Sequence, residues 1–133
     1  MDISPVIFVI DDSEIDCLIV NKLLHQKFPH IKLEAFHSAD EALETIKNLE
    51  ASHSILPSLI LLDINMPVKN GWEFLDEYQA LAPQSLKQIK VIIFTSSIHP
   101  ADPITARQYK MVVDFIVKPI RKEDIEEKIS RYC

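Results

Sequence analysis

The chain alternates short apolar runs with segments of helical periodicity, and this alternation constrains its fold more than any other feature. Continuous runs such as "VIFVI", "LILL" and "VIIF" are typical of strands that are buried on both faces of a sheet. Between the runs, apolar residues recur every three or four positions, as they do in amphipathic helices. The sequence therefore predicts five strands, at residues 6–10, 31–36, 59–62, 91–94 and 112–117.

A helix is predicted after each of these strands. Proline, which cannot continue a helix, ends the first and the third of them at Pro29 and Pro83. The fourth, at about 103–111, has the weakest apolar stripe, with Asp102 as its N-cap and Pro103 in its first turn. The apolar positions that define the other helices are Ile15, Leu18, Ile19, Leu23 and Leu24; Ala42, Leu43, Ile46 and Leu49; Phe74, Leu75, Tyr78 and Leu81; and Ile125, Ile129 and Tyr132.

Five β-α units in 133 residues favour a single domain, residues 1–133, and we expect no appended output domain. Strands that alternate with helices form parallel sheets that are covered on both faces. The continuous runs belong at the centre of such a sheet, and the mixed runs 31–36 and 112–117 belong at its edges. The predicted fold class is therefore α/β, a flavodoxin-like three-layer sandwich with the parallel strand order 2-1-3-4-5.

Polar side chains follow the central strands and the last strand. Right-handed crossovers place the carboxyl ends of all parallel strands at the same edge of the sheet, where ligands bind in this topology. We therefore expect one crevice to collect the residues at these ends. They are Asp11 and Asp12; Asp63; Thr95 with Ser96 and Ser97; and Lys118.

The three carboxylates of this crevice predict a metal site. Each like-charged pair costs about 1 kcal/mol at roughly 4 Å in water, and about 4 kcal/mol at an effective dielectric constant near 20. The ammonium group of Lys118 cannot balance three carboxylates, whereas an added Mg²⁺ brings the total charge to zero. The crevice would then accept a phosphoryl group, with a hydrogen bond from Thr95. Asp63, at the end of the middle strand, is the best-placed nucleophile and would form an acyl phosphate.

Each of these residues also has an ordinary structural interpretation. Asp11 and Asp12 could cap the first helix, Asp63 and Thr95 could be turn residues, and Lys118 could be a surface lysine. Their coincidence at one edge favours a shared site over five separate explanations.

Two other functions on this fold compete with a phosphorylated signalling domain. The first is a Mg²⁺-dependent small-molecule phosphatase with an aspartate nucleophile. Haloacid-dehalogenase-like phosphatases carry a second aspartate two residues beyond the nucleophile, where this chain has Asn65, which cannot transfer a proton in that way. The second is a flavin or nucleotide carrier, which is disfavoured because the carboxylates of "DDSEID" would repel a phosphate group.

The motifs "VIDD", "LLDINMP", "TSS" and "FIVKP" resemble, in order and spacing, those of the receiver domains of two-component response regulators. The resemblance covers essentially the whole chain. It implies that Asp63 is the phosphoacceptor, phosphorylated by a phosphohistidine on a partner protein. It also implies that Asp12 binds Mg²⁺ directly, that Asp11 acts nearby through water, and that Asn65 offers its backbone carbonyl to the metal.

The same resemblance implies a conformational switch. Thr95 matches the hydroxyl residue that moves towards the phosphoryl group, and Phe115 matches the aromatic residue that rotates into the vacated space. Lys118 matches the lysine that contacts the phosphoryl group, and its bond to Pro119 is expected to be cis. The chain departs from the family in two places: Phe115 replaces the commoner tyrosine, and a glycine that commonly precedes the last strand is absent, with Met111 and Val112 in that region.

The resemblance and the composition together define the expected partners. A sensor histidine kinase or a histidine phosphotransfer protein would supply the phosphoryl group, and a downstream protein would bind the face made by the fourth helix, the last strand and the last helix, including Arg107 and Lys110. The net charge of −6 argues against nucleic acid as a partner. We expect a monomer or a weak dimer that signals and does not turn over small substrates.

The remaining residues add few candidates. No apolar run is long enough for a membrane helix, so a cytoplasmic protein is expected, and its cysteines, Cys17 and Cys133, are expected to be reduced and remote from the crevice. Trp72 is expected close to the crevice, at the start of the third helix. The histidines have no ligand spacing and do not predict a zinc site; they are His25, His30, His37, His53 and His99.

Overall fold

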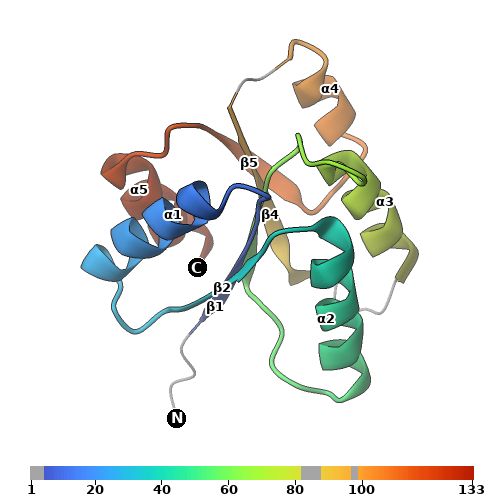
Figure 1. Ribbon diagram of the computed structural model, residues 1–133, viewed down its shortest axis with the longest axis horizontal. Coiled ribbons are helices and arrows are strands. Elements are labelled where there is room, and N and C mark those ends of the chain that lie inside the picture. The colour runs from blue at the N-terminus through green and yellow to red at the C-terminus, as the bar shows by residue number, and fades with distance from the viewer. Residues whose placement is uncertain (1–4, 82–87, 97–98) are drawn as a thin grey trace.

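A parallel five-stranded sheet with helices on both faces forms the protein (Figure 1). The computed structural model describes residues 5–81, 88–96 and 99–133. The strand order is β2-β1-β3-β4-β5, which confirms the predicted flavodoxin-like topology. The elements are β1 (Val6–Ile10), α1 (Glu14–Lys27), β2 (Lys32–Phe36), α2 (Ala39–Ala51), β3 (Leu59–Leu62), α3 (Gly71–Leu81), β4 (Lys90–Thr95), α4 (Asp102–Ala106), β5 (Val112–Val117) and α5 (Lys122–Tyr132).

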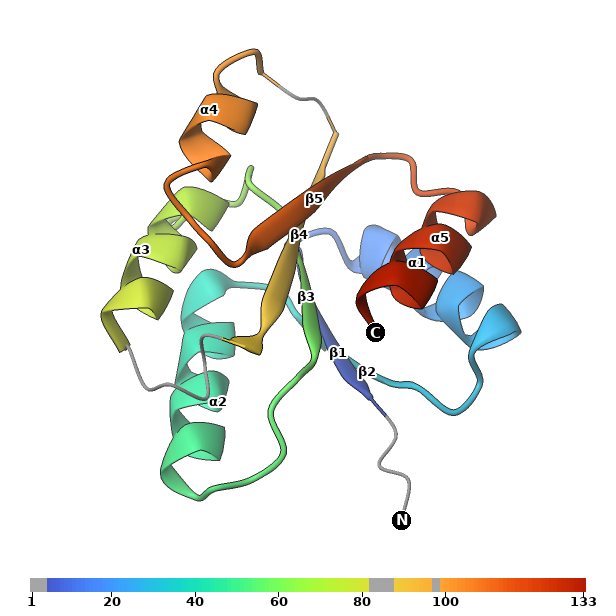
Figure 2. The ribbon, with the colours of Figure 1, turned by 180° about the vertical axis from the view of Figure 1, so that it is seen from behind.

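The sheet separates two hydrophobic cores because successive side chains of a strand point to opposite faces. In β1, Phe8 and Ile10 join the core under α2 and α3, whereas Ile7 and Val9 join the core under α1 and α5. The strands β3 and β4 divide their side chains between the two cores in the same way. Seen from either side, α1 and α5 cover one face, and α2, α3 and α4 cover the other (Figures 1 and 2).

The buried face of α1 differs from the predicted one. The helix buries Cys17, Val20 and Leu24. Three of the residues expected to define its apolar stripe are instead exposed: Ile15 (69%), Leu18 (61%) and Ile19 (40%). The sequence of α1 is apolar on two faces, so periodicity alone does not decide which of them packs on the sheet.

The helix α4 is shorter than predicted and begins one residue earlier. It ends at Ala106, and its N-cap is Ala101, so Asp102 lies in the helix and accepts a hydrogen bond from the His99 backbone N–H at 2.8 Å. After the helix, turns continue to β5, anchored by the buried side chain of Tyr109. This ring stacks on Trp72 at 5.7 Å, and its hydroxyl donates to Asp76 Oδ1 at 2.6 Å. These contacts tie the segment after α4 to α3.

The edge strand β5 contains an irregularity near its start. Val91 pairs with Val112, but Ile92 pairs with Asp114, so Val113 is an additional residue in the β5 strand. This β-bulge lies where the sequence lacks the glycine that commonly precedes the last strand. Asp114 is then held by the Lys128 ammonium group at 2.7 Å, which fixes α5 to the strand.

Several smaller predictions can also be compared with the structure. Both cysteines are free thiols, as expected. The predicted helix end at Pro83 and the candidate Ser97 lie outside the described residues. Within the described ranges, no helix is both long and apolar enough to span a membrane.

Candidate functional site

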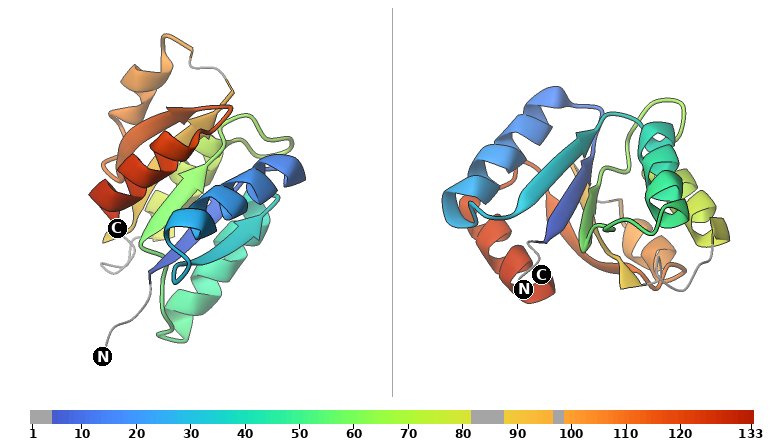
Figure 3. Two further views of the ribbon diagram at one scale, coloured as in Figure 1. Left: turned by 90° about the vertical axis from the view of Figure 1, so that its left-hand side faces the viewer. Right: turned by 90° about the horizontal axis from the view of Figure 1, so that it is seen from below.

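Three carboxylates meet at the carboxyl edge of the sheet, as predicted. Oxygen atoms of Asp11, Asp12 and Asp63 all lie within 4.8 Å of one another. The backbone N–H of Asp11 donates to Phe36 O and that of Asp63 donates to Ile10 O, both at 2.9 Å, so both residues extend the sheet before the chain turns away. The loops after the strands gather at this edge, at the opposite end of the sheet from the start of β1 (Figure 3). Asp11 and Asp63 are buried, and Asp12 is exposed.

Gly71, the only glycine of the chain, lies eight residues after Asp63, where the fold leaves no room for a side chain. Its N–H donates to Ile64 O at 2.9 Å, which folds the loop so that α3 begins against the end of β3. A Cβ atom at this position would lie 2.7 Å from Asp63 O and 2.9 Å from Ile64 Cα. Both distances are too short for a Cβ contact, so the backbone of one segment would have to move. Glycine therefore allows α3 to pack directly on the backbone of Asp63.

Lys118 reaches the acidic cluster from the end of β5. Its backbone N–H donates to Thr95 O at 2.7 Å, and its bond to Pro119 is cis, as predicted. The ammonium nitrogen lies 2.6 Å from Asp11 Oδ2 and 3.8 Å from Asp63 Oδ2. Burial alone would lower the pKa of Lys118, but its contacts with the neighbouring carboxylates raise that pKa above its usual range. The lysine is therefore firmly cationic within the site.

Asp63 is strained electrostatically in the absence of a metal. Burial, and next the Asp11 carboxylate, raise the pKa of Asp63 to about 6, although Lys118 acts in the opposite direction. Asp63 Oδ1 accepts the backbone N–H of Asn65 at 3.1 Å. The side-chain amide of Asn65 lies 3.5 Å from the hydroxyl of Thr95, which is fully buried. Residues from three strand ends thus surround the Asp63 carboxylate.

The donor set fits a hard divalent cation. Apart from its ion pair with Lys118, the fully buried Asp11 Oδ2 has no hydrogen-bond partner among the described residues. Among the described residues, Lys118 is the only cation paired with these carboxylates, and one ammonium group leaves the excess negative charge of the cluster unbalanced. The cluster offers only oxygen ligands, with the exposed Asp12 leaving room for water, which suits Mg²⁺ or Mn²⁺ better than zinc.

A profile of the response regulator receiver domain family matches residues 7–130 of the chain. The chain belongs to this family. Its members act as phosphorylation switches in two-component signalling and interact with histidine kinases or phosphotransfer proteins. The match supports that function and not the phosphatase alternative.

Related proteins agree with this assignment. The response regulator Rcp1 of Synechocystis sp. is 30% identical over 126 residues, which are 94% of this chain and 84% of that protein. The two-component response regulator ORR1 of Oryza sativa subsp. japonica is 31% identical over 122 residues, or 90% of this chain. The receiver domain spans about half the length of that rice protein, with 52% of it covered.

Solved structures show the same fold. A two-component response regulator from Cytophaga hutchinsonii superimposes with a TM-score of 0.84 at 24% identity, covering 98% of both chains. The Mn²⁺-bound form of Rcp1 has a TM-score of 0.73 at 27% identity and covers 96% of this chain and 90% of that chain. Rcp1 therefore provides a related protein whose structure was solved with a divalent cation.

Two residues of the receiver domain lie closer to the site than the sequence indicated. Asp16 Oδ2 is 2.9 Å from the Lys118 ammonium nitrogen. The buried thiol of Cys17 donates to Asp11 O at 3.6 Å, so the expectation that both cysteines are remote from the crevice is wrong for Cys17. Burial and the Asp11 charge raise the pKa of Cys17 to about 12, and this thiol stays protonated. Only the rotation of α1 about its axis brings both residues inward, and no motif signals that rotation.

Phe115 and Trp72 lie in the core on the α2 and α3 side of the sheet. Both are partly buried, and each packs against that core. Trp72 follows Gly71, which contacts the backbone of Asp63, but its stacking partner is Tyr109. The predicted position of Trp72 at the start of α3 is confirmed, and its ring connects that position to the segment after α4.

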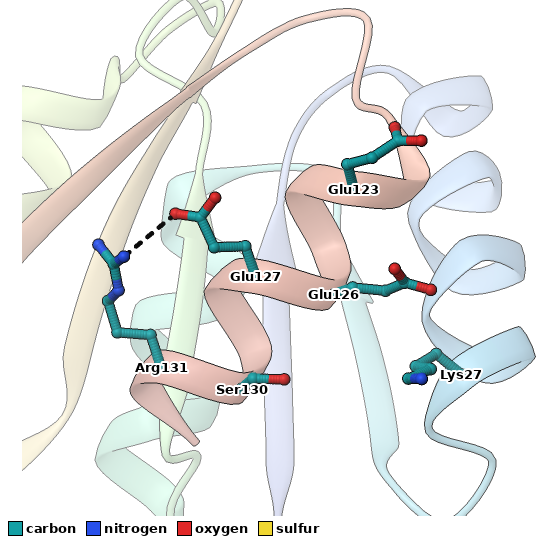
Figure 4. A pocket seen from close by; sticks show the side chains of 6 residues that line it. All are labelled: Lys27, Glu123, Glu126, Glu127, Ser130 and Arg131. Carbon is teal, nitrogen blue, oxygen red and sulfur yellow. Dashed lines mark ion pairs between the residues drawn. The ribbon is translucent and has the colours of Figure 1, made fainter.

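A pocket of about 640 Å³ lies between the end of α1 and α5, outside this site (Figure 4). Glu127 in its wall pairs with Arg131 at 3.4 Å. None of the carboxylates of the cluster lines it, and neither Thr95 nor Lys118 does. This hollow is therefore separate from the acidic cluster at the carboxyl edge of the sheet.

Proposed function

We propose that Asp63 is the phosphoacceptor of this receiver domain. A carboxylate oxygen of Asp63 attacks the phosphorus of a phosphohistidine, the P–N bond breaks, and its electron pair leaves with the imidazole. The observation that carries this assignment is the meeting of three carboxylates within 4.8 Å, with the Lys118 ammonium 3.8 Å from Asp63. The family match supplies the class of reaction.

The residues that would hold Mg²⁺ are Asp11, Asp12, Asp63 and the backbone carbonyl of Asn65. When bound, Mg²⁺ would supply positive charge to balance the oxygens of the transferring phosphoryl group. Lys118 binds another phosphoryl oxygen and orients the group for in-line transfer. The Thr95 hydroxyl, next to the Asn65 amide at 3.5 Å, donates a hydrogen bond to the phosphorylated side chain.

The switch follows from the placement of Thr95 and Phe115 on neighbouring strands. A dianion on Asp63 draws the Thr95 hydroxyl towards it, and the partly buried Phe115 ring moves into the space that Thr95 leaves. The two packings would differ in the surface made by α4, β5 and α5. That surface carries the exposed apolar side chains Ile104 (63%), Val113 (37%) and Val117 (47%), which is consistent with docking of a downstream protein.

The partners of the site follow from the same assignment. A sensor histidine kinase or a histidine phosphotransfer protein donates the phosphoryl group, and output occurs by protein docking or by onward relay of that group. We expect this to occur in the cytoplasm, in a monomer or weak dimer that does not turn over small substrates. Charge reversal at the exposed Arg107 and Lys110 is expected to weaken binding of the downstream protein.

Incubation with acetyl phosphate and Mg²⁺, followed by intact mass spectrometry, tests the assignment. The wild-type protein is expected to gain the mass of one phosphoryl group, and Asp63→Asn is expected to gain none. Asp102→Asn, which removes a carboxylate on α4 outside the cluster, serves as the matched control and is expected to be labelled normally. Labelling of Asp63→Asn at the wild-type level would refute the assignment.

A further inference from the structure

Asp16 is a fourth carboxylate at the phosphorylation site, and its contact is with Lys118. The distance from Lys118 Nζ to Asp16 Oδ2 is 2.9 Å, whereas the distance to Asp63 Oδ2 is 3.8 Å. Lys118 is therefore bound more closely to Asp16 than to the expected phosphoacceptor. The Asp16 side chain is 30% exposed, and the Lys118 side chain is 12% exposed, so this ion pair is partly shielded from water.

The position of Asp16 is fixed by the turn that also carries Asp11. The backbone N–H of Ser13 donates to Asp11 Oδ1 at 2.9 Å, and the Ser13 hydroxyl, as the N-cap of α1, accepts the backbone N–H of Asp16 at 3.2 Å. These two hydrogen bonds hold Asp16 beside the site in the third position of the helix. Asp16 is thus placed by the same local structure that places Asp11.

Neither of two ordinary roles, stabilising the helix dipole or binding the metal, accounts for the contact of Asp16 with Lys118. A carboxylate in the first turn of a helix favours the helix dipole, but Glu14 supplies such a charge in the same turn. The compact metal-binding cluster comprises Asp11, Asp12 and Asp63 and does not include Asp16. Among the described residues, the Asp16 carboxylate has no ion pair or side-chain hydrogen bond except the one with Lys118.

A shared ammonium group creates a competition. Lys118 has three N–H donors, and its two closest carboxylates are Asp11 at 2.6 Å and Asp16 at 2.9 Å. A phosphoryl group on Asp63 needs at least one of those donors for its own oxygens. The third donor does not reach Asp63 from this position, because 3.8 Å between Lys118 Nζ and Asp63 Oδ2 is beyond hydrogen-bond distance, and the contact with Asp16 holds the ammonium group there.

We propose that Asp16 is a positioning residue that holds Lys118 on the side of α1 and so opposes occupation of Asp63 by a phosphoryl group. The proposal rests on the proposed role of Asp63 and adds a residue that sets how readily that site is filled. Loss of the Asp16 charge releases Lys118 towards Asp63. The released lysine then binds the phosphoryl oxygens without first breaking an ion pair.

Beryllofluoride, which binds in place of a phosphoryl group, provides an equilibrium test. The full chain is titrated with beryllofluoride at saturating Mg²⁺, with the adduct followed by ¹⁹F NMR, in wild type, Asp16→Asn and Glu14→Gln. Glu14→Gln is the matched control because it removes the same charge from the same helical turn without a contact to Lys118. Asp16→Asn is expected to lower the dissociation constant about fivefold, corresponding to about 1 kcal/mol, and Glu14→Gln less than about twofold.

A second measurement reports on the lysine itself. In the metal-free protein, the ¹⁵N signal of the Lys118 ammonium group is expected to shift in Asp16→Asn and to stay in place in Glu14→Gln. If Asp16→Asn unfolds, Asp16→Ser takes its place, because serine is well accepted near the N-terminus of a helix.

The outcomes separate this proposal from the proposed function. Equal effects of the two substitutions would show a simple charge effect, and weaker binding in Asp16→Asn would show that Asp16 assists the site; either result overturns the proposal while leaving Asp63 as the phosphoacceptor. A wild-type protein that forms no adduct and takes no phosphoryl group from acetyl phosphate would overturn both.

Discussion

Replacement of Asp63 by asparagine should stabilise the metal-free protein. The side chain is 5% exposed and lies beside Asp11, and together these features raise its pKa from 3.8 to about 6. An ionised Asp63 therefore destabilises the folded state relative to the unfolded chain, where its pKa is ordinary. Asparagine has nearly the same shape, can keep the hydrogen bond from the Asn65 backbone, and carries no charge.

The size of this effect follows from the shift in pKa. A rise from 3.8 to about 6 corresponds to about 3 kcal/mol, since each tenfold change in the acid constant is worth about 1.4 kcal/mol. Below pH 3.8 the carboxyl is protonated in both states and causes no destabilisation. As the pH rises from 3.8 towards 6, Asp63 ionises more readily in the unfolded chain than in the folded protein, so the free energy of unfolding of the wild type falls. Above about pH 6 this decrease is complete. The free energy of unfolding of Asp63→Asn should thus exceed that of the wild type by about 2–3 kcal/mol at neutral pH.

Urea unfolding in EDTA between pH 4 and pH 8 measures this difference in the free energy of unfolding. Asp12→Asn is the matched control, because Asp12 belongs to the same cluster but is exposed, and its replacement should change stability by less than about 1 kcal/mol. Saturating Mg²⁺ should reduce the difference in the free energy of unfolding between Asp63→Asn and the wild type, because it stabilises the wild type. An Asp63→Asn protein that is no more stable than wild type at pH 7, or whose advantage does not depend on pH, would contradict this account of the site.

Three further changes test the surroundings of the site. Val68→Asn should stabilise the protein by about 1 kcal/mol in urea unfolding. Val68 is 97% exposed and has a φ of 68°, a left-handed conformation that is unfavourable for β-branched residues. The same change at Val117 should give no gain in stability. Gly71→Ala should lower the free energy of unfolding by at least about 1 kcal/mol and slow labelling by acetyl phosphate, because the new methyl group displaces the backbone of Asp63. An alanine variant as stable as the wild type would contradict this. Mg²⁺ or beryllofluoride should change the fluorescence of Trp72, which follows Gly71, and a flat titration would show that the end of β3 is not coupled to α3.

The topology and the acidic cluster could be predicted because both depend on short stretches of sequence. The apolar run 59–62 is buried on both faces, which places it at the centre of the sheet. Once the strands are parallel, their carboxyl ends must share one edge, so Asp11 and Asp63 meet although 52 residues separate them. The gathering of carboxylates at this edge then follows from the residue types at the strand ends.

Features that depend on the rotation or the length of a helix could not be predicted in the same way. The apolar residues of α1 lie on two faces, and packing selects Val20 in place of Leu18. That choice carries Cys17 under Asp11 and Asp16 towards Lys118. The early end of α4 is followed by turns in which Tyr109 is buried and stacks on Trp72 of α3, a tertiary contact that no local pattern records.

The same crowding of charge links the stability of the domain to its chemistry. Asp63 can attack phosphorus only if it is ionised, and in the metal-free fold ionisation is opposed by burial and by Asp11. A cation that binds only the folded state lowers this opposition and stabilises the fold, by about 1.4 kcal/mol for each tenfold rise in its concentration above the dissociation constant. Metal binding should therefore lower the pH at which Asp63 ionises and raise the stability of the domain together, with one affinity describing both changes.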